Sequence, residues 1–98
     1  MPDLDGVFAA NEVMAAGATE ALQRAGRRVP DDVAVAGFDD STATTSVVPA
    51  ITTMRRHFDL ICKAAVELLT ERINGAEPRH LTIPTELVIR GSTTPPPD

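Results

Sequence analysis

The apolar segment at residues 33–38 contains no polar side chain and ends at two consecutive carboxylates, Asp39 and Asp40. A continuous apolar run, unlike an alternation of apolar and polar residues, indicates a strand covered on both faces, as in a parallel α/β sheet. In open α/β sheets, ligands bind outside the carboxyl ends of the strands. The two acidic side chains are therefore placed to accept hydrogen bonds from a polar ligand. The alternative is that they close a turn or cap a helix.

The rest of the chain alternates between short apolar stretches and two helical patterns. We expect strands at residues 6–10, 33–38, 51–54 and 86–90, and residues 80–83 are able to form a further strand. The spacing of apolar residues predicts helices over about 12–25 and 57–74, ended by Gly26 and Gly75 respectively. Strand, helix and strand with short links form a right-handed βαβ unit. We therefore predict an α/β fold with an open, mostly parallel sheet and flanking helices.

Each predicted helix has an apolar face. In the first helix this face comprises Met14, Ala18, Leu22 and Ala25, beside a stripe of small and partly polar residues. In the second it comprises Phe58, Ile61, Cys62, Ala65, Leu68, Leu69 and Ile73. The single cysteine cannot form an internal disulfide, and its place on the apolar face predicts a buried, reduced thiol rather than a nucleophile.

Composition excludes several classes of function. The chain has 98 residues, one domain or a piece of one, and its net charge of −5 argues against contact with a nucleic-acid backbone. No secretory signal and no membrane-length apolar run is present, which predicts a soluble, cytoplasmic protein without a membrane partner. The sequence has no glycine-rich phosphate loop, no metal-ligand spacing and no nucleophile–base pattern. We therefore expect no enzyme, no metal and no cofactor.

Four segments, in order along the chain, resemble lactose-repressor-type (LacI/GalR) transcriptional regulators. Residues 9–18 (AANEVMAAGA) are similar to that family's strand-to-helix segment, and residues 28–40 (RVPDDVAVAGFDD) to its next loop and strand. Residues 49–55 (PAITTMR) resemble its crossover between subdomains, and residues 83–93 (IPTELVIRGST) its closing strand. Together the four segments span nearly the whole chain.

The resemblance implies a periplasmic-binding-protein-like effector domain, with two α/β subdomains around a ligand cleft. Residues 2–52 and 85–93 would belong to the C-terminal subdomain, and residues 53–84 to the crossover and a helix of the N-terminal subdomain. Family members are several times longer, so we expect Met1 to be a start inside a longer protein. DNA would be contacted only through a helix-turn-helix head that this chain lacks. The helix at 57–74 would need to bury its apolar face on the remaining sheet or on another chain.

The family binds sugars or related small polar molecules, which implies ligand roles for three residues. Asn11 matches a cleft position whose amide both donates and accepts hydrogen bonds, although a plain helix N-cap is the alternative. Asp39 matches the position whose carboxylate accepts hydrogen bonds from ligand hydroxyls. Phe58 matches a position that offers an apolar platform to a ring, and packing in a core is the alternative.

The resemblance also implies a homodimer. The residues that match the family's dimer surface are Ala15, Ala16, Gly17, Glu20, Ser46, Val47 and Val48. In a two-fold symmetric pair the same patch meets itself, and small residues permit close approach. The alternative is that alanines are merely good helix formers.

Two other functions are compatible with the sequence. One is a flavodoxin-like enzyme or phosphoacceptor domain in which Asp39 and Asp40 hold Mg²⁺. The other is a sugar-binding protein of a transport system with the same architecture, which the missing export signal disfavours.

Overall fold

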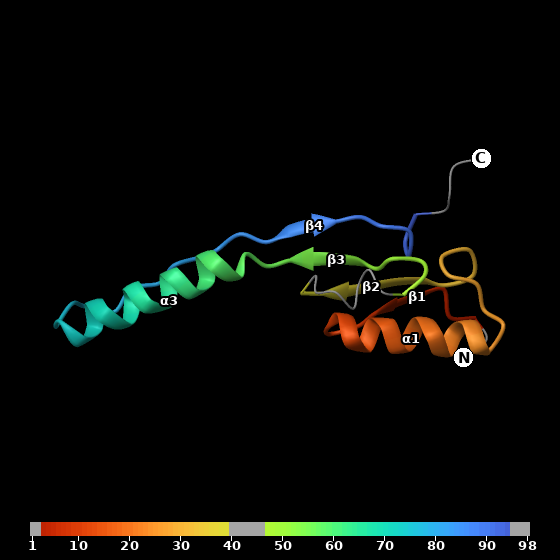
Figure 1. Cartoon of the computed structure of the whole chain (residues 1–98), viewed down its shortest axis with the longest axis horizontal. Coiled ribbons are helices and arrows are strands. Elements are labelled where there is room, and N and C mark those ends of the chain that lie inside the picture. The colour runs from red at the N-terminus through yellow and green to blue at the C-terminus, as the bar shows by residue number, and fades with distance from the viewer. Residues whose placement is uncertain (1–2, 40–46, 95–98) are drawn as a thin grey trace. The chain divides into compact units, whose positions relative to one another are not determined.

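The computed structural model describes residues 3–39 and 47–94 (Figure 1). Its elements are β1 (Gly6–Phe8), α1 (Glu12–Arg24), β2 (Ala34–Phe38), β3 (Thr52–Arg55), α3 (Phe58–Ile73) and β4 (Glu86–Val88). Contacts divide the chain into two compact units. The first runs up to Arg55 and resumes at Glu86, and the second is Arg56–Thr85. That these units are portions of two subdomains, divided at 52/53 and 84/85, stays a prediction.

The first unit contains a sheet with the strand order β1-β2-β3-β4. β1 pairs with β2 and β2 with β3 in parallel, whereas β3 and β4 are antiparallel. The predicted α/β fold with an open, mostly parallel sheet is therefore confirmed. The prediction that residues 80–83 are able to form a further strand is wrong, because the chain between α3 and β4 contains no helix or strand. Pro78 and Pro84, which have no amide hydrogen to donate, flank that stretch.

Helix α1 begins and ends where its local sequence predicts. The Asn11 side-chain oxygen accepts a hydrogen bond from the Met14 amide at 2.9 Å, which caps the first turn. Gly26 has φ +79°, the left-handed conformation that glycine adopts without a Cβ clash. The amide of the following Arg27 donates to Leu22 O at 2.9 Å, so the end of the helix is closed by backbone hydrogen bonds.

The face of α1 that packs on the sheet is only partly the predicted one, because Ala18 and Leu22 are half-buried but Met14 and Ala25 are exposed. Glu12, Ala15 and Thr19 are buried, whereas Met14 is 56 % exposed. The reason lies on β2, where a Cβ added to Gly37 would stand 3.0 Å from the Ala15 Cβ. The absence of a side chain at that point lets the small residues of α1 approach the sheet closely. The core cluster is Ala9, Ala15, Val35 and Ile51, with Val7, Leu22, Val29 and Val47 packed against it.

The second unit consists of α3 and the chain that returns from it to Thr85. An ion pair joins Arg79 to Glu71 at 2.7 Å, and Ala64 is the buried residue of the helix. The predicted apolar face is largely uncovered, with Phe58 53 %, Leu69 62 % and Ile73 75 % exposed. Cys62 is exposed as well, so the predicted buried thiol is wrong. The apolar face of α3 is exposed because the single segment that returns from the helix covers only one of its sides.

Candidate functional site

The carboxyl ends of β1 and β2 carry two of the predicted ligand residues. The strands are parallel neighbours with Phe8 opposite Ala36, and the Ala9 amide donates to Ala36 O at 2.8 Å. Asn11 follows β1, and Asp39 follows β2 directly. Because neighbouring parallel strands end at the same edge of a sheet, the structure brings Asn11 and Asp39 to one edge of the first unit.

Asn11 is half-buried and serves as the N-cap of α1. The cap occupies its side-chain oxygen, which accepts from the Met14 amide. The amide nitrogen of the same side chain takes no part in the cap, and it is the atom that can donate to a ligand hydroxyl. The cap and the ligand contact are therefore compatible.

Asp39 has an unusual backbone conformation, with φ +102° at a residue that is not glycine. Such a conformation is strained and persists only where the surrounding structure holds it. Here the Asp39 amide donates to Met54 O on β3 at 3.0 Å, which ties the residue to the neighbouring strand. Strained residues cluster at ligand sites. Asp40 lies outside the described residues.

Two buried polar side chains close to this edge were missed by the sequence analysis. Glu12 is 7 % and Thr53 1 % exposed, and neither Glu12 Oε2 nor Thr53 Oγ1 has a hydrogen-bond partner among the described residues. Both lie beside Gly37: its added Cβ would be 3.6 Å from the Glu12 Cα, and Thr53 is its partner in the β2–β3 register. Their sequence signals, an acidic residue in a first helical turn and a threonine in a strand, are too common to single them out.

Phe58 is the first residue of α3 and lies in the second unit, so the structure groups only Asn11 and Asp39. Its ring is 53 % exposed, so it does not pack in a core. The guanidinium carbon of Arg56 lies 4.6 Å from the ring centroid, within the range of a cation–π contact. The ring at this position is thus exposed, with the Arg56 guanidinium stacked on it, and its role as a platform for a ligand stays a prediction.

The residues matched to a dimer surface divide into two groups. Ala15 is fully buried, and Val47 packs against the core cluster, so both side chains face inward. Ala16 is half-buried, whereas Gly17, Glu20 and Val48 are exposed. A Cβ added to Gly17 would meet nothing within 4 Å. Ser46 lies outside the described residues.

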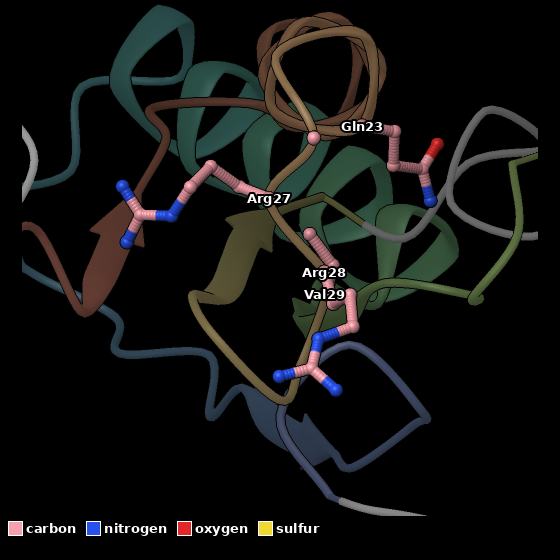
Figure 2. Close-up of a pocket in the computed structure, with 5 residues that line it drawn as sticks. Gln23, Arg27, Arg28 and Val29 are labelled. Carbon is pink, nitrogen blue, oxygen red and sulfur yellow. The ribbon is translucent and has the colours of Figure 1, made fainter.

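A hollow of about 340 Å³ lies at the C-terminal end of α1, lined by Gln23, Gly26, Arg27, Arg28 and Val29. Figure 2 shows that the three long polar side chains point in different directions. Each is engaged by its own chain: Gln23 donates to Val48 O and Arg27 to Leu4 O, both at 2.7 Å.

Arg28 binds the Asp32 carboxylate at 3.0 Å. The Arg28 side chain and the Arg28 backbone amide both donate hydrogen bonds to this carboxylate, and they lower the Asp32 pKa to about 2. The hollow therefore does not assemble a set of groups that converge on a ligand.

The described residues contain neither a cluster of metal-binding side chains nor a membrane-spanning helix. Within 3–39 and 47–94, no group of three or more His, Cys, Asp or Glu residues is arranged to hold a metal ion. Neither helix in those ranges is long and apolar enough to cross a membrane.

An open α/β sheet with polar residues at the carboxyl ends of its parallel strands is the architecture in which ligands bind at that edge. The family model described as periplasmic binding protein-like domain matches residues 1–93. The chain is 42 % identical over 93 residues to the lactose operon repressor of Rhizobium radiobacter, covering 94 % of this chain and 82 % of that sequence. It belongs to the lactose-repressor (LacI) family of transcriptional regulators.

Two solved structures extend the comparison. The complex of the transcriptional regulator CelR with cellobiose matches with a TM-score of 0.88 and 42 % identity, over 93 % of this chain and 28 % of that one. The lac repressor dimer bound to operator and an anti-inducer matches with a TM-score of 0.79 and 30 % identity, over 91 % of this chain and 32 % of that one. The chain thus spans about a third or less of these two regulators.

Proposed function

We propose that the chain is the C-terminal part of the effector-binding domain of a transcriptional regulator, and that its ligand is a small polyhydroxyl molecule of the sugar class. The cellobiose-bound relative supports this ligand class, and the operator-bound relative supports a role in transcription. Family membership disfavours the magnesium-dependent enzyme and the transport protein. A regulator of this type works on DNA, so its place is the cytoplasm.

The proposal rests on the position of Asn11 and Asp39, which both lie at the same edge of the sheet. An amide both donates to and accepts from hydroxyl groups, and a carboxylate accepts from them. A sugar supplies several hydroxyl donors, which offsets the cost of withdrawing a carboxylate from water. The exposed ring of Phe58 offers the apolar contact that the ring face of a sugar requires.

The mechanism needs no chemical step. A ligand that binds one arrangement of the two units more tightly than another shifts the populations of the two arrangements. The shift is transmitted to a DNA-binding portion, and ligand and DNA affinities change reciprocally. The protein is therefore a sensor rather than an enzyme.

The test is binding of a panel of mono- and disaccharides to the 98-residue chain, measured by ligand-observed NMR. We expect Asp39→Asn, which keeps the size and removes the charge, to weaken binding by about ten- to a hundredfold. Asn11→Ser retains a capping oxygen but removes the amide, so it should fold normally and bind more weakly. Asp31→Asn, an exposed carboxylate in the loop before β2, is the matched control. Binding that survives both edge variants unchanged would refute the site.

We further propose that two copies pair through the exposed residues Gly17, Glu20 and Val48, as the lac repressor dimer among the relatives suggests. Gly17→Gln tests this surface because the added side chain meets nothing within its own chain. It should raise helix stability, since glycine is a poor helix former, and weaken dimerisation measured by analytical ultracentrifugation. Thr70→Gln on α3 is the control. An undiminished dimer in Gly17→Gln would place the interface elsewhere.

A further inference from the structure

Helix α3 ends at an asparagine that is followed by a glycine, and both residues are exposed. Asn74 is the C-cap, with φ −85° and ψ 10°, and Gly75 has a left-handed φ of +89°. A Cβ added to Gly75 would meet nothing within 4 Å, so the space beside the glycine is open. An asparagine in this position is open to attack on its side-chain carbonyl carbon by the backbone nitrogen of the next residue, because glycine has no side chain to hinder the approach.

The reaction that this neighbour permits is deamidation. The Gly75 nitrogen forms a bond to Asn74 Cγ, the Cγ–Nδ2 bond breaks, and ammonia leaves with the proton that the Gly75 nitrogen gives up. One water molecule then opens the resulting five-membered succinimide. Attack of this water at Cγ gives aspartate, whereas attack at the main-chain carbonyl carbon gives isoaspartate. In both cases an amide and water become a carboxyl group, ionised at neutral pH, and ammonia.

The closed end of α3 holds the two reacting atoms apart. With Asn74 at ψ 10°, the Gly75 nitrogen points away from the asparagine side chain, and its N–H donates to Arg72 O at 3.1 Å. The Ala76 amide donates to Glu71 O at 2.9 Å, which completes the closure of the helix by backbone hydrogen bonds. Attack on the side chain therefore requires the last turn of the helix to open first.

Two arginine side chains fasten this turn. Arg72 donates to Ala76 O at 2.8 Å. Arg79, on the segment that returns from the helix, donates to both carboxylate oxygens of Glu71, each at 2.7 Å. A two-pronged contact of this kind fixes the orientation of the two groups as well as their distance. We refer to the Arg72–Ala76 and Arg79–Glu71 contacts as the helix-end contacts.

We propose that Asn74 is a site of spontaneous deamidation, and that the helix-end contacts set its rate. Helix ends open locally at a small cost in free energy, so the reactive geometry is visited from the folded state. The product places a carboxylate at the C-terminal end of α3, where the helix dipole disfavours negative charge. Isoaspartate also adds a methylene group to the main chain, which displaces the Gly75 and Ala76 amides from their acceptors.

The modification therefore loosens the end of α3 irreversibly as the molecule ages. This property goes beyond the proposed sensing function and does not depend on it, since it requires neither ligand nor DNA.

The test follows the 98-residue chain during incubation at mildly alkaline pH, by ammonia release and by mass spectrometry of proteolytic peptides. We expect the peptide that contains Asn74 to gain the mass difference between an amide and a carboxyl group. Asn11, the other asparagine, is an internal control, because it precedes Glu12 and its side-chain oxygen accepts from the Met14 amide. Asp5 also precedes a glycine, but rearrangement of an aspartate releases no ammonia and changes no mass.

Variants of the helix-end contacts test what sets the rate. Arg79→Met should speed deamidation by about two- to threefold, a modest factor because the ion pair is exposed. Arg72→Met should act in the same direction. Lys63→Met, which removes a positive charge from an exposed position of the same helix, is the matched control. Hydrogen exchange of the Gly75 and Ala76 amides should speed up by the same factor as deamidation, since both processes require the same opening.

Each outcome bears on the proposal. If the Asn74 peptide gains no mass in wild type or in either arginine variant, the site is overturned. If both arginine variants deamidate no faster than Lys63→Met, control by the helix-end contacts is overturned. Faster deamidation in variants whose circular dichroism is unchanged supports both. Should Arg79→Met lose helix, Glu71→Gln, which weakens the same pair and keeps the side-chain length, takes its place.

Discussion

Two consecutive threonines on β3 have opposite hydrogen-bonding states. The Thr52 hydroxyl contacts Arg90 and Thr93, whereas the buried Thr53 hydroxyl has no hydrogen-bond partner in the part of the chain that the structure describes. An unsatisfied buried hydroxyl costs free energy that an isosteric methyl group does not. We expect Thr53→Val to raise the free energy of unfolding by about 1 kcal/mol and Thr52→Val to lower it by about 1–3 kcal/mol. Urea unfolding of the two variants measures the difference. A destabilised Thr53→Val would mean that the hydroxyl does have a partner in solution.

The strained backbone of Asp39 predicts that two variants of this residue will differ in stability but not in sugar binding. At φ +102°, glycine is unstrained but alanine is not. We expect Asp39→Gly to be about 1–2 kcal/mol more stable than Asp39→Ala, because strain of this kind costs about 1–3 kcal/mol. Both variants lack the carboxylate and should lose sugar binding equally. Equal stabilities in urea unfolding would show that the residue relaxes out of this conformation in solution.

Residues whose role is local could be predicted from the sequence, and those that depend on distant partners could not. The Asn11 cap and the glycine that ends α1 are fixed by neighbours within one helical turn. The Ser92 hydroxyl bonds to Val35, 57 positions away in the chain. No local pattern encodes such a contact, because it depends on how the strands are ordered and registered.

At the level of elements, the apolar pattern predicted the helices but not what covers them. On α1 the small residues give two neighbouring stripes of similar apolar character, and the choice between them is made by Gly37 on β2. On α3 the predicted apolar stripe exists, but Leu69 and Ile73 are exposed because little of the second unit packs on them. The spacing of apolar residues indicates which face of a helix is apolar. Whether that face is buried depends on the element that packs against it.

The loop between α1 and β2 contains an ion pair whose contribution to the stability of the fold depends on pH. Arg28 lowers the Asp32 pKa from 3.8 to about 2 through a side-chain hydrogen bond. A depressed carboxyl pKa stabilises the fold above the unfolded value and loses that effect as pH falls toward the folded value. We therefore expect wild type to melt higher than Asp32→Asn above about pH 4, with the difference shrinking as pH falls and mostly lost at about pH 2. Thermal melts across this range, with Asp31→Asn as control, provide the measurement.

The pair is solvent-exposed, so the difference should also shrink in high salt. A melting difference between wild type and Asp32→Asn that persists unchanged at pH 2 would show that the loop depends on something other than this charge pair.

At the scale of the whole molecule, the uncovered face of α3 determines how the isolated chain behaves. Its exposed large apolar side chains include Phe58, Val66, Leu69 and Ile73. Apolar surface of this kind promotes association. We expect the 98-residue chain to form species beyond the dimer as its concentration rises. The double variant Leu69→Glu with Ile73→Lys should abolish them, since it replaces the apolar contact by a favourable i,i+4 ion pair.

Sedimentation velocity distinguishes this association from the α1-mediated dimer, because Gly17→Gln should weaken only the dimer, whereas the α3 variant should remove only the larger species. Circular dichroism should be unchanged in the α3 variant, since neither side chain contributes to the core. If the α3 variant instead unfolds the helix, then Leu69 and Ile73 are buried in solution, and the second unit folds by covering the face that is exposed in this structure. If it leaves the larger species in place, the association surface lies on another element, such as the exposed Phe8 of β1.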